Sequence, residues 1–278
     1  MKLIDFDGLF DEKLTQFMEE NKNKYTEKQW EDIIPKLYKK FGDTFVAKVK
    51  CTPKEYYAKM TDSELVQTLI AHIESDIPAP EFLCAEIAQR GEVETLAPML
   101  KSDNTQVATY ALNLIGDDKR VYDEYFAILQ KENADVDLQN DVIDIFKLHA
   151  DEMKDRALAF YKQGIAKEAM LEILSRVHAR DDEIYALLME NFLTYTNIPM
   201  HASYLAAYGD ERALKPLLAK IEDLSIGFVE FQELKYAIEA LGGQYDNPRD
   251  FTADKDYLEV EAQGRKITAS YETDEPRS

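Results

Sequence analysis

The strongest constraint on the fold is an internal similarity between two ten-residue segments. Residues 91–100 read GEVETLAPML, and residues 209–218, which begin 118 positions later, read GDERALKPLL. A glycine, an acidic residue, a leucine, a proline and a second leucine occupy the same places in both segments. Self-similarity of this kind is the mark of a chain built from repeated structural units, so it bears on the whole architecture.

A second set of matched residues follows each segment, and the spacing within this set is identical in the two copies. The set is Gln106, Tyr110, Ala111 and Gly116 in the first copy, and Gln232, Tyr236, Ala237 and Gly242 in the second. The two matches together predict a helical hairpin: a helix that begins after a glycine and an acid, a short turn, and a second helix that ends at a glycine. One hairpin buries little apolar surface, so we expect hairpins to stack.

Six positions divide the chain at steps of 25 to 33 residues: Gly91, Gly116, His149, Arg180, Gly209 and Gly242. The four glycines carry the similarity, whereas the two middle positions lack the glycine. The intervals that end at these two positions still hold amphipathic segments, at 142–146 before His149 and at 170–177 before Arg180. With only 10 glycines and 9 prolines in 278 residues, few residues interrupt helices. The predicted fold class is all-α, an α-solenoid of stacked helical hairpins.

Residues 209–218 followed by 236–242 resemble HEAT-like repeats, and more narrowly the short repeats named after phycobilisome lyases. The resemblance is best over 209–242, weaker over 91–116, and does not reach before about residue 61. It implies an α-solenoid and no particular activity, because such repeats occur in scaffolds, adaptors, lyases and glycosylases. We therefore expect an N-terminal helical cap (1–60), a repeat array (61–243) and a C-terminal tail (244–278).

Both ends of the chain carry local signals. Capping boxes at Thr26 and Thr61 predict helix starts, and the first precedes an apolar stripe from Trp30 to Phe41 that Gly42 closes. At the other end, residues 257–262 alternate apolar and polar side chains, which is the strand period. With residues 266–271 they predict a C-terminal β-hairpin.

Charge limits the partners. The chain has 33 basic and 54 acidic residues, a net charge of −21, which repels nucleic acid and anionic membranes and steers basic proteins. Local basic residues (Lys36, Lys39, Lys40, Lys48 and Lys50) lie outside the matched repeats. The amino terminus has no apolar export segment and the chain has 2 cysteines, so we expect a cytoplasmic protein with reduced thiols.

Motifs for chemistry are few. The four histidines include no His-Glu dipeptide and no pair three or four apart, so no metal site and no cofactor are expected. His178 with Asp181 and Asp182 is the one alternative, although acids in such a place more often cap a helix. Neither Cys51 nor Cys84 lies in a nucleophile motif, and no phosphate-binding glycine loop is present.

The sequence thus favours a non-enzymatic scaffold or adaptor whose second helices bind a basic protein through an acidic concave surface. The candidate partner-binding residues are the polar ones on those helices: Gln106, Thr109, Asn113, Asp141, Asp144, Glu168, Glu172, Gln232 and Glu233. The alternative is an enzyme or ligand binder on the same scaffold, either a lyase-like pigment binder or a divergent DNA glycosylase. The oligomeric state is left open.

Overall fold

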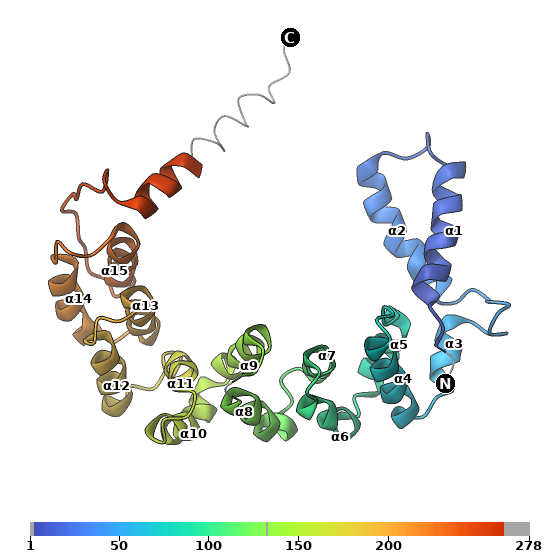
Figure 1. The fold of residues 1–278 in the computed structure, drawn as a ribbon, viewed down its shortest axis with the longest axis horizontal. Coiled ribbons are helices and arrows are strands. Elements are labelled where there is room, and N and C mark those ends of the chain that lie inside the picture. The colour runs from blue at the N-terminus through green and yellow to red at the C-terminus, as the bar shows by residue number, and fades with distance from the viewer. Residues whose placement is uncertain (1–2, 132, 264–278) are drawn as a thin grey trace, which may run out of the picture. The chain divides into compact units, whose positions relative to one another are not determined.

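The computed structural model describes residues 3–131 and 133–263. Every regular element in these residues is helical, which confirms the all-α class (Figure 1). The chain forms two compact units, residues 1–142 and 143–278, and the division falls inside α9 (Val136–Leu148). The boundaries predicted at residues 60 and 243 mark where the repeats begin and end in the sequence, which is a different criterion from compactness. They stay predictions.

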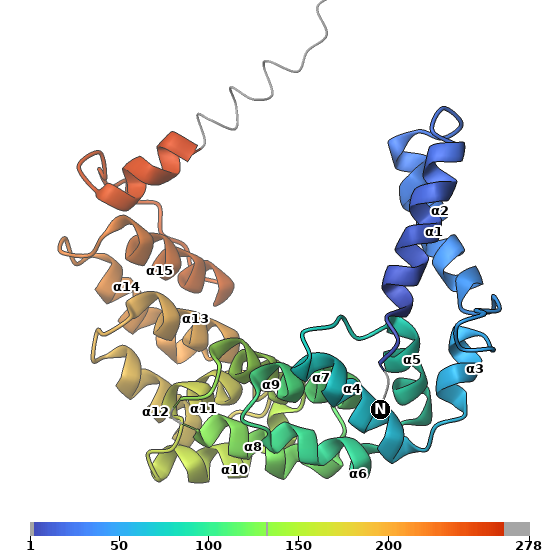
Figure 2. The ribbon, with the colours of Figure 1, turned by 45° about the vertical axis from the view of Figure 1, so that its right-hand side comes forward.

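The first unit begins with the hairpin of α1 and α2, which Figure 2 shows from the side. Its helices are α1 (Phe6–Glu20), α2 (Glu27–Phe41), α3 (Pro53–Ala58), α4 (Asp62–Glu74), α5 (Glu81–Arg90), α6 (Val93–Leu96), α7 (Thr105–Ile115), α8 (Tyr122–Gln130) and the start of α9, with the 3₁₀ helices η1 (Ala97–Lys101) and η2 (Lys119–Val121). Both expected capping boxes are present, at Thr26 before α2 and at Thr61 before α4. These local signals determine where the helices begin because the side chains satisfy backbone N–H groups that have no partner in the helix.

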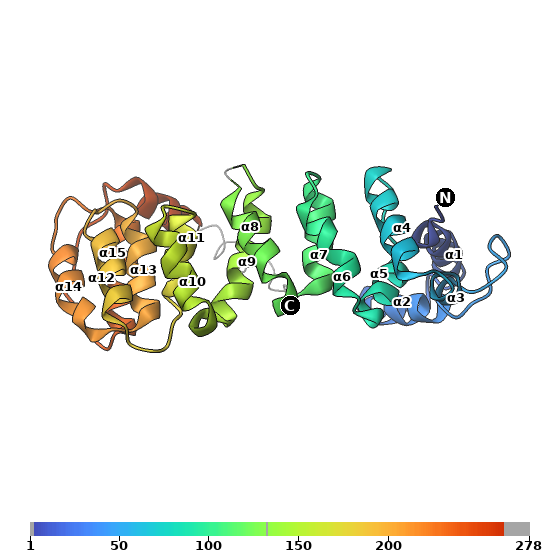
Figure 3. The ribbon, with the colours of Figure 1, turned by 90° about the horizontal axis from the view of Figure 1, so that it is seen from below.

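The second unit consists of paired helices. They are α10 (Ala150–Lys162), α11 (Lys167–Leu174), α12 (Asp182–Phe192), α13 (Ile198–Tyr208), α14 (Leu214–Ile221) and α15 (Phe228–Ala240), with η3 (Glu211–Ala213) before α14. Within each pair, α10 packs on α11, α12 on α13 and α14 on α15. The second helices also pack on one another, α11 on α13 and α13 on α15. Figure 1 shows the pairs in succession, and Figure 3 shows the same helices from below.

The four matched glycines share one structural role, since each lies at the end of a helix with a positive φ. The φ angles are 63° at Gly91, 66° at Gly116, 71° at Gly209 and 82° at Gly242. A residue with a Cβ is disfavoured in this region of φ. The recurrence of glycine at these places therefore reflects helix termination.

The repeat pattern also predicts that Leu96, Val107, Leu114, Leu214 and Leu241 lie on helix faces that meet neighbouring repeats. In the structure Leu96, Val107 and Leu241 are buried, whereas Leu114 and Leu214 are only half-buried. In α14 the buried residues are Leu217 and Ile221, one turn apart. Leu214 is the first residue of α14, so it lies at the edge of the buried face.

The expected C-terminal β-hairpin fails at its first strand, because residues 255–263 are helical. The carboxylate of Asp254 accepts hydrogen bonds from the backbone N–H groups of Asp256 (3.0 Å) and Tyr257 (3.1 Å), which is a helix N-cap. Lys255 and Glu259 then pair at 3.5 Å with i,i+4 spacing. Six alternating residues do not outweigh these helix signals. The second expected strand, 266–271, lies outside the described residues.

Candidate functional site

Three of the four candidate residues of the first unit lie on α7, on the side that faces the connection between α4 and α5. Gln106 and Asn113 are exposed and Thr109 is half-buried. Gln106 and Thr109, together with Tyr110 of α7 and His72 of α4, line a cavity of about 310 Å³, whereas Asn113 does not. The structure thus groups two of the three candidates around a hollow that the sequence does not reveal.

His72 is the unexpected residue of this cavity. Its side chain is fully buried, and neither ring nitrogen has a hydrogen-bonding partner among the described residues. Burial lowers the pKa of the imidazole, and nearby backbone groups of Ile77 and Pro78 only partly oppose this. His72 is therefore neutral at pH 7. In the sequence His72 lies on the apolar face of its helix with Leu65 and Leu69. This position indicates that the side chain is buried, but it does not reveal the cavity.

The candidate acids of α9 differ in their surroundings. Asp141, in the first unit, is exposed. Asp144, in the second unit, pairs with Lys147 at 2.6 Å, and the same ammonium group pairs with Glu172 of α11 at 2.7 Å. Burial lowers the pKa of Lys147, but its hydrogen bonds to the two carboxylates raise that pKa by more. One lysine thus joins two candidate acids and offsets part of their charge, which reduces the acidity expected of this surface.

Two buried residues of α13 lie near the acids of α11. Burial raises the pKa of the Tyr204 hydroxyl, and Glu172 and Glu168 raise it further. Burial also lowers the pKa of His201, whose ring lies edge-on to Tyr204 with centroids 5.9 Å apart. Glu168 itself is exposed and Glu172 is half-buried. The exposed negative charge of this region therefore belongs mainly to Glu168 and Asp144.

One side of α15 combines polar and apolar side chains. Gln232 and Glu233 are half-buried, while Tyr236 is 60% exposed and Val229 is 43% exposed. These four residues follow i, i+3, i+4, i+7 spacing and so share one side of the helix. An exposed tyrosine among polar residues is typical of protein interfaces. Tyr236 belongs to the repeat similarity, but the sequence reasoning did not include it among the candidates.

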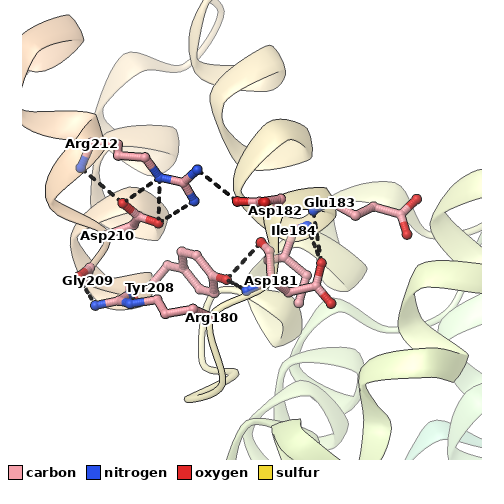
Figure 4. Close-up of polar contacts among 9 residues, drawn as sticks. All are labelled: Arg180, Asp181, Asp182, Glu183, Ile184, Tyr208, Gly209, Asp210 and Arg212. Carbon is pink, nitrogen blue, oxygen red and sulfur yellow. Dashed lines mark hydrogen bonds and ion pairs between the residues drawn. The ribbon is translucent and has the colours of Figure 1, made fainter.

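Several charged residues of the repeats have structural roles (Figure 4). The buried carboxylate of Asp210 caps η3 by accepting from the N–H of Arg212 (3.0 Å), and it pairs with the Arg212 guanidinium at 2.7 Å. Arg212 also reaches Asp182 of the preceding hairpin at 2.8 Å. Its hydrogen bond to Asp210 lowers the pKa of that carboxyl. The first unit repeats the arrangement: Arg120 pairs with Asp118 at 2.8 Å and with Glu94 at 2.7 Å. These contacts join successive hairpins.

Arg180 makes a second connection between neighbouring hairpins. Its guanidinium donates to the carbonyl oxygens of Tyr208, at 2.7 Å, and of Gly209 (Figure 4). The Tyr208 hydroxyl in turn accepts from the N–H of Asp181 at 2.7 Å. Arg180 is one of the two dividing positions of the chain that lack glycine. Its side chain thus binds the backbone carbonyl of the next dividing position, Gly209.

The residues considered for a metal do not converge on one point. His178 pairs with Asp151, with Nδ1 and Oδ2 2.8 Å apart. Asp181 caps α12 and pairs with Lys154 at 2.5 Å, and Asp182 pairs with Arg212. The two acids therefore act in capping and ion pairing, as their positions suggested. Across residues 3–131 and 133–263, histidine, cysteine and acidic side chains form no group of three suited to a metal ion.

Both cysteines are free thiols that are largely covered by the protein. Cys51 is buried and Cys84 is half-buried. Burial raises the pKa of the Cys84 thiol to about 11, with further increases from Asp7 and Glu81. Its reactive thiolate is therefore scarce at neutral pH. No helix of the described part of the chain has the length and apolar character needed to cross a bilayer.

Comparison with known proteins finds no matching family model and no matching curated protein. The resemblance to HEAT-like repeats therefore stays a prediction, and function has to be argued from the sites described above.

Proposed function

We propose that this chain is a non-enzymatic scaffold whose hairpins form an α-solenoid and whose second helices bind a basic protein. The observation that supports this most is in the second unit, where α11, α13 and α15 pack in succession. Glu168 on α11 and Tyr236 on α15 are both exposed. Stacked second helices with such side chains provide an extended surface for one partner.

The chemistry of this surface fits a partner that presents lysine or arginine. Exposed carboxylates accept charge-assisted hydrogen bonds from these side chains. Glu168 is exposed for this, whereas the exposed Asp144 shares its carboxylate with Lys147 at 2.6 Å. Tyr236 adds an amphipathic side chain that can be buried at low entropic cost. The net charge of −21 raises the rate at which a basic partner arrives.

The proposal is tested by cross-linking the tagged protein in its native cells and mapping the linked sites by mass spectrometry. We expect the partner to be basic and to cross-link at Lys167 and Lys235, which lie on α11 and α15 beside the proposed surface. Replacing Glu168 with Gln and Tyr236 with Ala should remove these cross-links. A control with Asp155→Asn and Glu190→Gln, both exposed on the first helices α10 and α12, should keep them. Cross-links confined to the first helices would contradict the proposal.

DNA is the contrasting partner. A mobility-shift assay at about 50 mM salt should show no tight duplex binding, because a strongly acidic protein lacks the cationic contacts that such binding needs. Tight, salt-sensitive binding of duplex DNA by the unmodified protein would overturn the proposal in favour of a glycosylase-like function.

A further inference from the structure

The hairpin of α1 and α2 contains a groove that is separate from the second helices of the repeats. The groove has a volume of about 210 Å³ and is lined by one side of each helix, including Lys13, Leu14 and Phe17 of α1 and Leu37, Lys40 and Phe41 of α2. On α1 the lining residues follow i, i+3, i+4, i+7 from Phe10, and on α2 they follow i, i+3, i+4 from Leu37, with Thr44 of the next turn completing the lining. Both helices thus present a continuous side to the groove.

The apolar residues of this hairpin are incompletely covered. In α2, which carries a regular apolar stripe from Trp30 to Phe41, Phe41 is the one residue that is buried. Leu14, Phe17 and Leu37 are half-buried. Most of a helix's stability in a protein comes from burial of its apolar face against other elements. Two helices cannot cover each other completely, so this hairpin has apolar surface left for a third element.

The base of the hairpin is held firmly, so the groove exists before any partner binds. The Tyr38 ring stacks on Phe82 of α5 with centroids 4.6 Å apart, and its hydroxyl donates to Asp7 at 2.5 Å. Towards the other end of the hairpin, Trp30 packs edge-on against Phe17 with centroids 6.0 Å apart. Contacts at both ends thus fix the two helices relative to each other.

Charge distinguishes this groove from the rest of the protein. Its two charged lining residues, Lys13 and Lys40, are both basic and both exposed, although the chain as a whole is strongly acidic. The Lys13 ammonium group lies 5.1 Å from the centre of the Phe41 ring, directly beside the apolar floor. An occupant of matching character has apolar side chains with carboxylates next to them.

We propose that this groove binds an amphipathic helix of a partner protein, with acidic residues beside its apolar anchors. The lining on α1 extends from Phe10 to Phe17, about 10 Å at 1.5 Å per residue. That length fits two turns of a third helix, with anchors at i, i+3 or i+4, and i+7. The inference does not depend on the proposed function of the second helices, since it concerns other residues and a partner of opposite charge.

A membrane surface is the less favourable occupant. The apolar residues form a groove between two helices, whereas helices that lie on membranes present an apolar face outwards. We therefore argue for a helix.

The test uses three synthetic peptides of about 15 residues, a length at which helices begin to be stable alone. All three carry leucine or phenylalanine at i, i+3, i+4 and i+7, and the flanking positions are glutamate, glutamine or lysine. Trp30 is the single tryptophan of the chain and packs against groove residue Phe17, so its fluorescence reports binding of peptides without tryptophan. We expect the glutamate peptide to bind about tenfold more tightly than the lysine peptide at low salt.

Charge reversal in the groove gives the decisive comparison. The Lys13→Glu, Lys40→Glu double variant should reverse the preference, so that the lysine peptide binds more tightly than the glutamate peptide. The matched control is Lys28→Glu with Lys39→Glu, which makes the same charge change at exposed positions on the opposite side of α2 and should leave the preference unchanged. Circular dichroism verifies that each variant is folded, and Lys13→Gln with Lys40→Gln replaces any charge-reversed variant that is not.

Three results would overturn the proposal. One is the absence of a fluorescence change with all three peptides up to about 1 mM, because a dissociation constant above that concentration is too weak for a specific helix-binding site. Another is equal affinity for all three peptides in the unmodified protein and in the double variant. The third is binding to phosphatidylcholine and phosphatidylglycerol vesicles that the double variant abolishes, without any binding of the glutamate peptide.

Discussion

At the scale of single residues, two buried histidines are held neutral because burial outweighs the effect of nearby carboxylates, which are Asp5 and Asp7 for His72 and Glu168 for His201. Burial lowers the pKa of His72 in α4 and of His201 in α13. A lowered pKa in the folded state means that the unfolded chain binds a proton more readily than the folded chain. Stability is therefore complete above the unfolded-state pKa of about 6.5 and decreases as the pH falls towards the folded-state values.

We predict that the free energy of unfolding is nearly constant from pH 7 to pH 8 and falls between about pH 6.5 and pH 5. Replacing His72 and His201 with Phe should make the decrease over that interval shallower, because the unfolded chain then no longer takes up a proton at either position. Denaturant titrations at each pH give the slope, which is informative even if the variant is less stable at every pH. An unchanged slope in the double variant would show that these histidines are not responsible.

The charged residues of the hairpin contacts also differ strongly in their surroundings. The Asp210 side chain is 9% exposed and caps η3, whereas its neighbour in the ion pair, Asp182, is 91% exposed. Asp210→Ala should lower the free energy of unfolding by about 2 kcal/mol, because it removes a helix cap and leaves Arg212 without its nearest partner. Asp182→Ala should cost less than about 1 kcal/mol. Urea denaturation of both variants tests the ranking, and equal losses would contradict these roles.

At the scale of elements, the sequence allowed the helix ends to be predicted better than the buried faces. The glycines with positive φ and the two threonine capping boxes act within a few residues, so their effects are visible in the sequence. The burial of Leu217 in place of Leu214 depends on where α14 begins after η3, which the similarity alone does not reveal. The strand expected at 257–262 was wrong for a related reason: Asp254 begins a helix there.

The candidate site was predictable to the same extent. Helical spacing placed Glu168, Gln232 and Glu233 on second helices, where the structure has them. The bridge from Lys147 to Glu172 spans two helices, and the cavity beside His72 lies between α7 and the end of α4. Such contacts between elements depend on which helices are neighbours, and one sequence alone does not determine that.

The corrected face of α14 leads to a test at this scale. Leu217 is fully buried, so Leu217→Ala should lower the free energy of unfolding by about 2 to 5 kcal/mol. Leu214→Ala should cost less, about 1 kcal/mol, because the half-buried side chain leaves a smaller cavity. Thermal or urea denaturation distinguishes the two variants. A larger loss of unfolding free energy for Leu214→Ala than for Leu217→Ala would contradict this assignment of the buried face.

At the scale of the whole molecule, charge is distributed in two ways that correspond to the two proposed partners. The net charge of −21 and the exposed acids of α9 and α11 favour a basic protein. The lysines beside the groove of α1 and α2 favour an acidic helix. Such a separation of charge would allow a scaffold to bind an acidic partner and a basic partner at different places.

The central claim is that the second helices of the second unit bind a basic protein electrostatically. The most direct measurement is the association rate of the cross-linked partner, over a range of salt concentrations, with three forms of the protein. The unmodified protein should associate fast and with strong salt dependence. Asp144→Asn with Glu168→Gln and Glu172→Gln should associate several-fold more slowly and with weaker salt dependence. Asp155→Asn with Glu190→Gln and Glu211→Gln, which removes three exposed charges from first helices and η3, should change the rate less. Equal rates and salt dependence in all three forms would contradict the account.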